Sequence, residues 1–243
     1  MKLNKRWTQQ EAIEKFGNSE NNLHRIAVQF NSTKITDPEC SHYCEFYVQH
    51  FKDRKDENLK ILEIGVKEGD SLLMWKEYFP NSNIVGLELN PEPLKNFRHD
   101  RVKIYFGDQT DTTLLREICQ NEGPFDIIID DASHINEHHQ ISFEYLFEKG
   151  LSNNGIYVIE DLGTSYWSPW GGALKKKDAT IEFMKDLVDN INFRFHKGNR
   201  DDYVGIPPAD DLSLSYFDLN ITGISFHKGM CFVQKGPNPA DIE

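Results

Sequence analysis

The sequence has few cysteines and no long apolar segment, and both absences exclude protein classes. Its 243 residues include four cysteines: Cys40, Cys44, Cys119 and Cys231. Cys40 and Cys44 form a C-x3-C pair, but no second pair lies nearby to complete a zinc site. We expect reduced structural thiols. No apolar run approaches the ~18 residues that a membrane span needs, and the opening MKLNKRWTQQEAIEKF has no apolar core of a signal peptide. We therefore expect a cytoplasmic protein without a membrane span.

Basic residues are outnumbered by acidic ones. The chain has 27 Lys and Arg against 39 Asp and Glu, a formal net charge of -12, and its one basic run is Lys175–Lys177. Nucleic-acid affinity depends on clustered Lys and Arg, so a phosphate-backbone partner is disfavoured. The composition favours a small-molecule ligand.

Short apolar runs separated by helix-length segments fill the middle of the chain. Runs that are apolar on both faces and spaced in this way are typical of parallel strands in βαβ units. Five runs follow this pattern: residues 60–65, 83–88, 102–107, 125–130 and 155–160. Two intervening segments, residues 111–120 and 137–148, are predicted to be crossover helices. The pattern predicts an α/β fold with a doubly wound sheet.

The flanking segments have different patterns. Residues 1–58 are predicted to form an N-terminal helical extension, with a Thr8 cap and an aromatic helix from Tyr43 to Phe51 that packs on the core, and residues 59–243 the main domain. After Glu160 we expect four further pieces: a long loop over 161–177, a helix over 179–190, a short strand over 193–197 and a closing strand over 224–234. The Asp-rich segment 199–220 is expected to be a surface insertion.

A glycine-containing turn follows the first strand. In LEIGVKEGDSLLMW, Glu63 ends the apolar run, Gly65 and Gly69 lie four apart, and Asp70 or Ser71 is expected to cap the next helix. Glycine permits positive φ and a close approach of backbone to ligand. G-x-G-x-x-G is absent, which disfavours a nicotinamide-dependent oxidoreductase. E-x-G-x-x-x-G resembles the first motif of class I S-adenosylmethionine (SAM) methyltransferases.

Acidic and amide side chains at the ends of the next two strands extend this ligand edge. Glu88 is placed to accept hydrogen bonds from ribose hydroxyls, and Asp108 and Gln109 lie where an adenine edge is expected. Ligands of open α/β sheets bind outside the carboxyl ends of the strands. We therefore expect these residues to face one cofactor.

Three carboxylates are predicted to meet at the ends of the fourth and fifth strands. Asp131 follows the fourth strand, and Glu160 and Asp161 follow the fifth. Because neighbouring strands lie about 4.8 Å apart, these acids are expected to converge, and they would repel one another without a cation. All-oxygen ligation selects a hard ion, so the sequence predicts Mg²⁺ or a similar divalent ion.

His134 lies three residues after Asp131 and is a candidate general base, because histidine titrates near neutral pH. A capping role for His134 stays open. So does a zinc or iron site built from Asp131, His134 and His138, although it would leave Glu160 and Asp161 without a role. His138 and His139 are otherwise expected on the following helix, exposed or packed.

The segments IIIDDASHINEHH and YVIEDLGTSYW, followed by a GG pair, resemble the macrocin and mycinamicin sugar O-methyltransferases and the related cephalosporin hydroxylase-like group. The resemblance covers roughly residues 41–172. Ala132 stands where that family usually has glycine, and the glycine loop is shorter than in many relatives.

The resemblance implies a Rossmann-like methyltransferase fold with a seven-stranded, mostly parallel sheet, an often homo-oligomeric assembly, and roles for individual residues. It implies Mg²⁺ on Asp131, Glu160 and Asp161, and His134 as the catalytic base. The residues implied for SAM are Glu63 to Gly69, Ser71, Glu88, Gln109 and Asp130.

The function expected from the residues and the resemblance is metal-dependent transfer of the SAM methyl group to a hydroxyl of a sugar or glycosylated metabolite, such as an antibiotic, glycolipid or capsular saccharide. Tyr166 and Trp167, just beyond the acids, are expected to contact the acceptor. The alternatives are an N-directed or phosphate-directed methyltransferase and a non-catalytic SAM- or metal-binding regulator.

Overall fold

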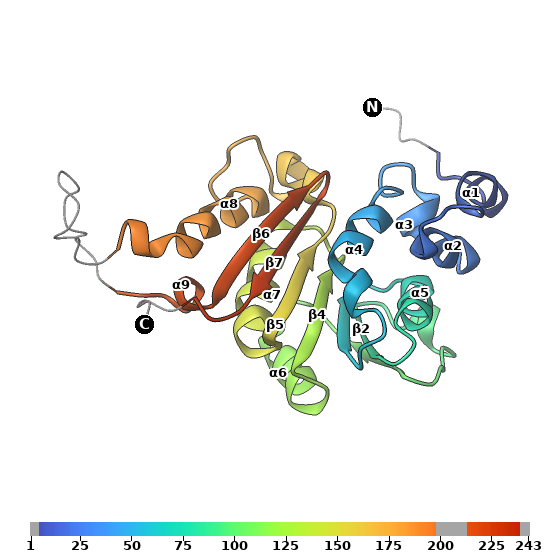
Figure 1. Ribbon diagram of the computed structural model, residues 1–243, viewed down its shortest axis with the longest axis horizontal. Coiled ribbons are helices and arrows are strands. Elements are labelled where there is room, and N and C mark those ends of the chain that lie inside the picture. The colour runs from blue at the N-terminus through green and yellow to red at the C-terminus, as the bar shows by residue number, and fades with distance from the viewer. Residues whose placement is uncertain (1–4, 198–212, 239–243) are drawn as a thin grey trace.

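The computed structural model describes residues 5–197 and 213–238, and within them a seven-stranded sheet forms the centre of the molecule (Figure 1). Its strands are β1 (Lys60–Ile64), β2 (Asn83–Glu88), β3 (Val102–Phe106), β4 (Phe125–Asp130), β5 (Leu151–Ile159), β6 (Ile221–His227) and β7 (Met230–Lys235). The order is β3-β2-β1-β4-β5-β7-β6, with β7 antiparallel to both neighbours and the other pairings parallel. The predicted Rossmann-like, mostly parallel sheet is confirmed.

Helices precede the sheet and alternate with its strands. The N-terminal segment contains α1 (Gln9–Phe16), α2 (Asn22–Gln29), α3 (Thr33–Thr36), α4 (Tyr43–Phe51) and the 3₁₀ turn η1 (Lys52–Arg54). The later helices are α5 (Asp70–Tyr78), η2 (Glu92–Leu94), α6 (Thr112–Asn121), α7 (Asn136–Lys149), α8 (Thr180–Ile191) and α9 (Tyr216–Asn220). The Thr8 cap is confirmed: Thr8 Oγ1 accepts the Glu11 N–H, and the Glu11 carboxylate accepts the Thr8 N–H, which forms a capping box.

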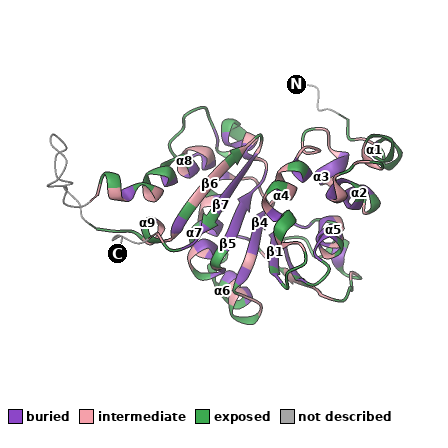
Figure 2. Cartoon of the chain, viewed as in Figure 1, coloured by how far each residue is buried: buried purple, intermediate pink, exposed green. Residues whose placement is uncertain are grey.

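The central strands of the sheet are buried on both faces (Figure 2). Side chains alternate along each strand, so Ile127 and Ile129 of β4 enter one core while Ile128 enters the other. The first core includes side chains of α2, α4 and α5, such as Leu23, Tyr47 and Trp75. The second includes side chains of α6 and α7, such as Leu115 and Phe143. Helices therefore cover both faces of the sheet, and the N-terminal helices pack in the first core.

Two sequence predictions near the C-terminal end were wrong. Residues 193–195 form a 3₁₀ turn (η5, Phe193–Phe195), not a strand. The single closing strand predicted over 224–234 is a hairpin of β6 and β7, whose turn contains Gly229 at φ +78°. The Lys-Gly pair before Met230 was the overlooked turn signal, because glycine adopts positive φ without steric cost.

The predicted long loop after β5 contains two short 3₁₀ turns, η3 (Leu162–Tyr166) and η4 (Ser168–Trp170). Most of the predicted insertion, including four of its five aspartates (Asp201, Asp202, Asp210 and Asp211), lies outside the described residues. The described end of that segment is α9, which begins at a Ser215–Asp218 capping box.

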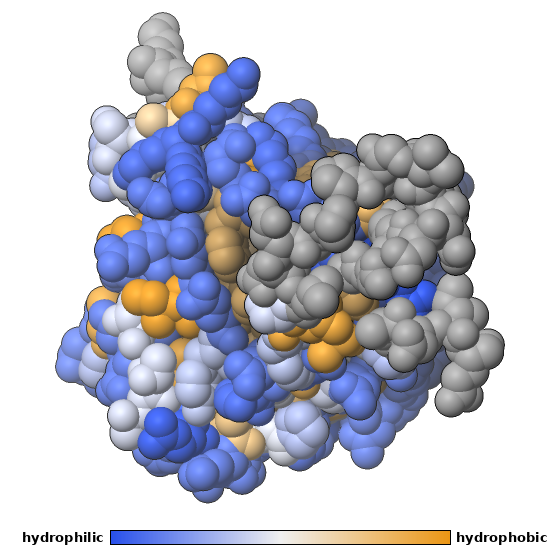
Figure 3. Space-filling view, turned by 90° about the vertical axis from the view of Figure 1, so that its left-hand side faces the viewer, coloured by the Kyte–Doolittle hydropathy of each residue, from blue (hydrophilic) through white to orange (hydrophobic). Residues whose placement is uncertain are grey.

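The face beside α8 and α9 is mainly hydrophilic, with separate apolar patches (Figure 3). Exposed apolar side chains in this part of the chain include Val188, Phe195 and Leu219. Among the described residues, each helix is too short or too polar to cross a lipid bilayer.

Candidate active site

The candidate site lies where the carboxyl ends of β1 and β4 meet. The chain runs from β1 towards β2 on one side and from β4 towards β5 on the other, so a crevice opens between them. Three residues continue the ladder beyond the strand ends. Gly65 N–H bonds Leu87 O at 2.8 Å, Asp131 N–H bonds Ile64 O at 2.9 Å, and Glu160 N–H bonds Asp130 O at 3.0 Å. Gly65, Asp131 and Glu160 therefore stand side by side at this edge.

Gly65 allows the glycine loop to pass closely over the β4 end. Its φ is +84°, and a Cβ there would lie 2.4 Å from both Ala132 Cα and Asp131 O. Gly69, at φ +89°, is the N-cap of α5. Neither Asp70 nor Ser71 caps the helix as predicted: Asp70 is its first residue, and Ser71 Oγ instead donates to Glu63 Oε2 at 2.6 Å.

Glu88 and Asp108 accept backbone hydrogen bonds. Glu88 Oε2 accepts the N–H groups of Val66 and Lys67 at 3.1 and 2.8 Å, so it holds the glycine loop from the neighbouring strand. Asp108 is exposed and accepts the N–H and hydroxyl of Thr110, and these bonds lower its pKa.

Asp130 points into the second core, away from Asp131. Its fully buried carboxylate accepts hydrogen bonds from Ser142 Oγ at 2.6 Å, Gln109 Nε2 at 3.1 Å and Tyr157 OH at 3.1 Å, and lies 3.2 Å from His139 Nδ1. Burial by itself would raise the pKa of Asp130, but His139 and the hydrogen bonds lower it. Asp130 and Gln109 are therefore tied to α7.

Three acids point to the opposite face, the one covered by the N-terminal helices. Lys34, from α3, is 2% exposed and lies among them. Its ammonium is 2.6 Å from Glu160 Oε1, 2.7 Å from Asp131 Oδ2 and 3.3 Å from Glu63 Oε1. A lysine of the N-terminal segment is therefore a cation among the carboxylates.

Two tyrosines of α4 also bind acids after β5. Tyr47 OH donates to Glu160 Oε1, and Tyr43 OH donates to Asp161 Oδ1 at 2.7 Å. Burial, followed by the nearby carboxylate, raises the pKa of each phenol, so both remain protonated donors. The aromatic helix predicted to pack on the core thus also supplies polar contacts to the site.

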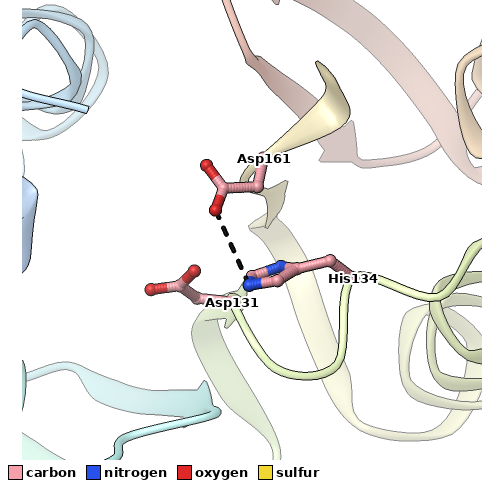
Figure 4. A group of neighbouring side chains, drawn as sticks. All are labelled: Asp131, His134 and Asp161. Carbon is pink, nitrogen blue, oxygen red and sulfur yellow. Dashed lines mark ion pairs between the residues drawn. The ribbon is translucent and has the colours of Figure 1, made fainter. Parts of the chain in front are cut away.

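Asp131, His134 and Asp161 form a group whose ligand atoms all lie within 4.8 Å of one another. Their side chains point towards one another from the ends of β4 and β5 (Figure 4). His134 Nε2 is 3.6 Å from Asp161 Oδ2. Two carboxylates and an imidazole can hold a divalent ion. Glu160 lies beside this group, with Oε1 bonded to Lys34 and Tyr47.

The site carries excess negative charge, which suits a bound cation. Three acids (Glu63, Asp131 and Glu160) surround one lysine, and a fourth, Asp161, lies beside Asp131 and His134. Burial, and then the neighbouring Asp131, raises the pKa of Glu160 to about 8. Burial likewise raises the pKa of Glu63. A dication would relieve this repulsion without requiring the acids to be protonated.

His134 adopts the left-handed conformation, with φ +58°, and its buried Nδ1 has no hydrogen-bond partner. Asp161 is also left-handed, at φ +53°. Such backbone positions cost about 1–3 kcal/mol each and are concentrated at functional sites. His138 and His139 are directed elsewhere: His138 Nδ1 is 3.0 Å from Ser133 Oγ, and His139 faces Asp130.

A cavity of about 350 Å³ opens in front of these groups. Its lining includes Gly65, Ser71, Glu88, Asp131, His134, Glu160 and Asp161. Glu63, Gly69, Asp108, Gln109 and Asp130 are not part of the lining. Tyr166 and Trp167 are also outside it; they are 42% and 46% exposed in and after η3.

Sequence reasoning missed the contribution of the N-terminal segment. From this segment the cavity is lined by Lys34 and by Arg6, Thr33, Asp37 and Cys40, while the two tyrosines bind the acids from outside the lining. The C-x3-C spacing was the sequence signal closest to these residues, but it did not indicate their role. Cys40 Sγ makes a weak contact with Asp161 Oδ1 at 3.7 Å. All four cysteines are free.

No protein-family model matches the chain. Among curated proteins, mycinamicin VI 2''-O-methyltransferase of Micromonospora griseorubida is 35% identical over 202 residues, covering 79% of this chain and 47% of that protein. Demethylmacrocin O-methyltransferase of Streptomyces fradiae is 36% identical over 202 residues, covering 79% and 48%. The chain thus spans about half the length of the curated relatives it matches.

The chain is also similar to solved structures of such a methyltransferase. The MycE methyltransferase of the mycinamycin pathway, in complex with Mg and SAH, superposes with a TM-score of 0.77 at 31% identity, over 90% of this chain and 54% of that one. A second MycE structure, with Mg, SAH and mycinamycin VI, gives 0.76 at 30% identity, over 95% and 62%. Agreement of sequence and fold over this length makes the chain a homologue of part of these methyltransferases.

Proposed function

We propose that this chain is a metal-dependent O-methyltransferase that moves the methyl group of SAM to a hydroxyl of a sugar or glycosylated metabolite. The observation that carries the proposal is the group of Asp131, His134 and Asp161, which faces a cavity beside the glycine loop. The homologues are named as sugar O-methyltransferases, and the MycE complexes hold Mg and SAH.

The proposed cofactor contacts fall into two sets. Gly65, Ser71 and Glu88 line the cavity and would face SAM directly. Glu63, Gly69, Asp108, Gln109 and Asp130 would act from behind it by fixing the loops: Glu63 binds Ser71, and Gln109 Oε1 accepts the Ser133 N–H at 3.1 Å. SAM supplies a methyl group on a positively charged sulfur.

Asp131, Glu160 and Asp161 are the proposed metal ligands. Asp131 and Asp161 already belong to the group that fits a divalent ion, and Glu160 lies in the same cavity wall. A bound Mg²⁺ lowers the pKa of a hydroxyl that it contacts. Tyr43 keeps Asp161 in place through its 2.7 Å hydrogen bond.

His134 is the proposed general base. It would take the proton of the acceptor hydroxyl as that oxygen forms a bond to the methyl carbon, while the sulfur keeps the electrons of the broken bond. Asp161, 3.6 Å from His134 Nε2, would stabilise the positive charge that the imidazole gains. Tyr166 and Trp167 are exposed near this edge of the sheet and are proposed to contact the sugar.

The test uses the purified chain with SAM, MgCl₂ and glycosylated acceptors, beginning with mycinamicin VI and demethylmacrocin, and measures SAH release and acceptor mass. We expect a gain of one methyl group on at least one sugar hydroxyl, and loss of turnover in EDTA while SAM binding persists. Turnover in EDTA would remove the metal from the proposal. Methylation at nitrogen would favour an N-methyltransferase, and SAM binding without transfer to any acceptor would favour a regulatory protein.

We also propose that the protein works in the cytoplasm and as a homo-oligomer. The four free cysteines suit a reducing compartment. The resemblance to often oligomeric enzymes and the apolar patches of Figure 3 support self-association. Light scattering of the full chain at several concentrations would measure the assembly; a monomer throughout would refute it.

A further inference from the structure

The ammonium of Lys34 lies where a metal ion would compete with it for the same carboxylates. Its ammonium contacts carboxylates from three adjacent strands: Glu63 of β1, Asp131 after β4 and Glu160 after β5. The ammonium donates hydrogen bonds to Asp131 and Glu160, and Glu63 lies at ion-pair distance. Two of these acids, Asp131 and Glu160, are also proposed metal ligands.

The lysine is held firmly in this position. It belongs to α3, whose cap Ser32 is itself buried and accepts the Lys34 N–H at 3.3 Å. Burial by itself would lower the pKa of the ammonium, but Asp131, Glu160 and Glu63 raise it well above its usual range. The lysine is therefore positively charged, although its side chain is only 2% exposed.

A cation and a dication cannot both take the same carboxylate oxygens at close range without strong repulsion. Asp131 Oδ2 and Glu160 Oε1 are bonded to Lys34, whereas Asp161 is bonded through Oδ1 to Tyr43. Coordination through these same oxygens of Asp131 and Glu160 requires the lysine to loosen its contacts, and coordination through their other oxygens still brings the ion close to the ammonium. Coordination by Asp161 and His134 does not require the lysine to loosen its contacts.

We propose that Lys34 is a built-in competitor of the divalent ion: it neutralises Asp131 and Glu160 in the metal-free protein and thereby weakens metal binding at the site. This inference rests on the proposed metal-dependent function. It assigns Lys34 a positioning role, because the lysine acts through the two carboxylates.

The test compares Lys34→Met with the wild-type chain, using Mn²⁺ as the probe. Isothermal titration calorimetry gives the dissociation constant, and thermal unfolding gives the midpoint with and without the ion. We expect Lys34→Met to bind Mn²⁺ more tightly, on the order of tenfold, which is an ordinary coupling between two binding events. Its metal-free midpoint should fall, and Mn²⁺ should raise that midpoint more than in the wild type.

Lys235→Met is the matched control. Lys235 is also buried, 4% exposed, but lies at the other end of β7, where it donates to the carbonyls of Phe147, Glu148 and Leu151. It should lose stability without any change in Mn²⁺ affinity. Lys34→Arg keeps the charge and should keep the weak affinity of the wild type.

Unchanged or weaker Mn²⁺ binding by Lys34→Met would overturn the inference. If Lys34→Met does not fold, crystals of the wild type soaked in Mn²⁺ decide: ammonium contacts to Asp131 and Glu160 that stay near 3 Å with the ion bound would also overturn it, and longer contacts would support it. Absence of Mn²⁺ binding in every variant would refute the lysine inference and the metal together. Methyl transfer with normal Mn²⁺ binding but no Lys34 effect would refute the lysine inference alone.

Discussion

Asp130 and Asp131 are neighbours in sequence and occupy different environments, because successive side chains of a strand point to opposite faces. Asp130 is fully buried against α7, while Asp131 faces Lys34 and the cavity. Strand-end position alone predicted that acids gather at this edge of the sheet. The sequence could not show which acid is used to anchor a helix, since that depends on partners such as His139 and Ser142.

Replacement of His134 tests its role as base. His134→Ala should lower kcat by about 10²- to 10⁴-fold, the usual contribution of a general base, and leave the dissociation constant of SAM nearly unchanged. Steady-state kinetics and calorimetry measure both quantities. His138→Ala, which loses the contact with Ser133, is the control. Equal losses in the two variants would argue against a specific role for His134.

Replacement of Gly65 tests the close contact between the glycine loop and β4. Gly65→Ala should lower the free energy of unfolding by at least about 1–3 kcal/mol, because the residue is left-handed and its Cβ would meet backbone atoms. Gly163→Ala is the control, since a Cβ there has no atom within 4 Å. Urea denaturation measures both. A Gly65→Ala variant as stable as Gly163→Ala would show that the loop can move aside.

At the scale of elements, hydrophobic periodicity predicted the five parallel strands and the crossover helices, because the strands are apolar runs separated by segments of helical length. The β6–β7 hairpin was missed because its two strands follow one another with only a short turn around Gly229. The approach of α3 to the acids was also unpredictable. The four-residue helix has no periodic pattern, and Lys34 contacts Glu160 across 126 positions of sequence.

The packing of α4 on β6 should depend on pH. His50 and His227 join these elements, with their Nε2 atoms 3.1 Å apart. Burial, followed by His227, lowers the pKa of His50, and burial lowers that of His227. The unfolded chain therefore binds protons at higher pH than the folded one. The free energy of unfolding should be highest above the ordinary histidine pKa of about 6.5 and should fall as the pH drops below it.

His227→Gln separates this pair from other acid effects, because an amide keeps a hydrogen-bonding group and does not titrate in this range. Urea denaturation between pH 7.5 and pH 5 should show a shallower loss of stability in the variant than in the wild type. His99→Gln, at an exposed position, should keep the wild-type slope. Identical slopes in all three proteins would exclude the pair as a source of acid sensitivity.

For the whole molecule, the site combines residues of the predicted N-terminal extension and of the predicted main domain. The predicted boundary at residues 58 and 59 falls between η1 and β1, yet side chains of both parts share the first core and line one cavity. Composition and periodicity separated a polar helical segment from an α/β segment. The contacts between them are long-range and leave no periodic trace.

Because SAM is proposed to bind only the folded chain, it should stabilise the whole molecule. At a concentration of 100 times its dissociation constant, SAM should raise the free energy of unfolding by about 2.7 kcal/mol. Urea denaturation at several SAM concentrations measures the increase. An increase that does not grow with the logarithm of SAM concentration would contradict binding to a single folded-state site.

The alternation at the end of β4 restricts how this protein can evolve. Loss or gain of one residue between Ile127 and Asp130 would exchange the directions of the two aspartates. Asp130, which now binds α7, would point to the cavity, and Asp131 would point into the second core. Length changes there would damage architecture and chemistry in a single event, whereas substitutions would test them one at a time.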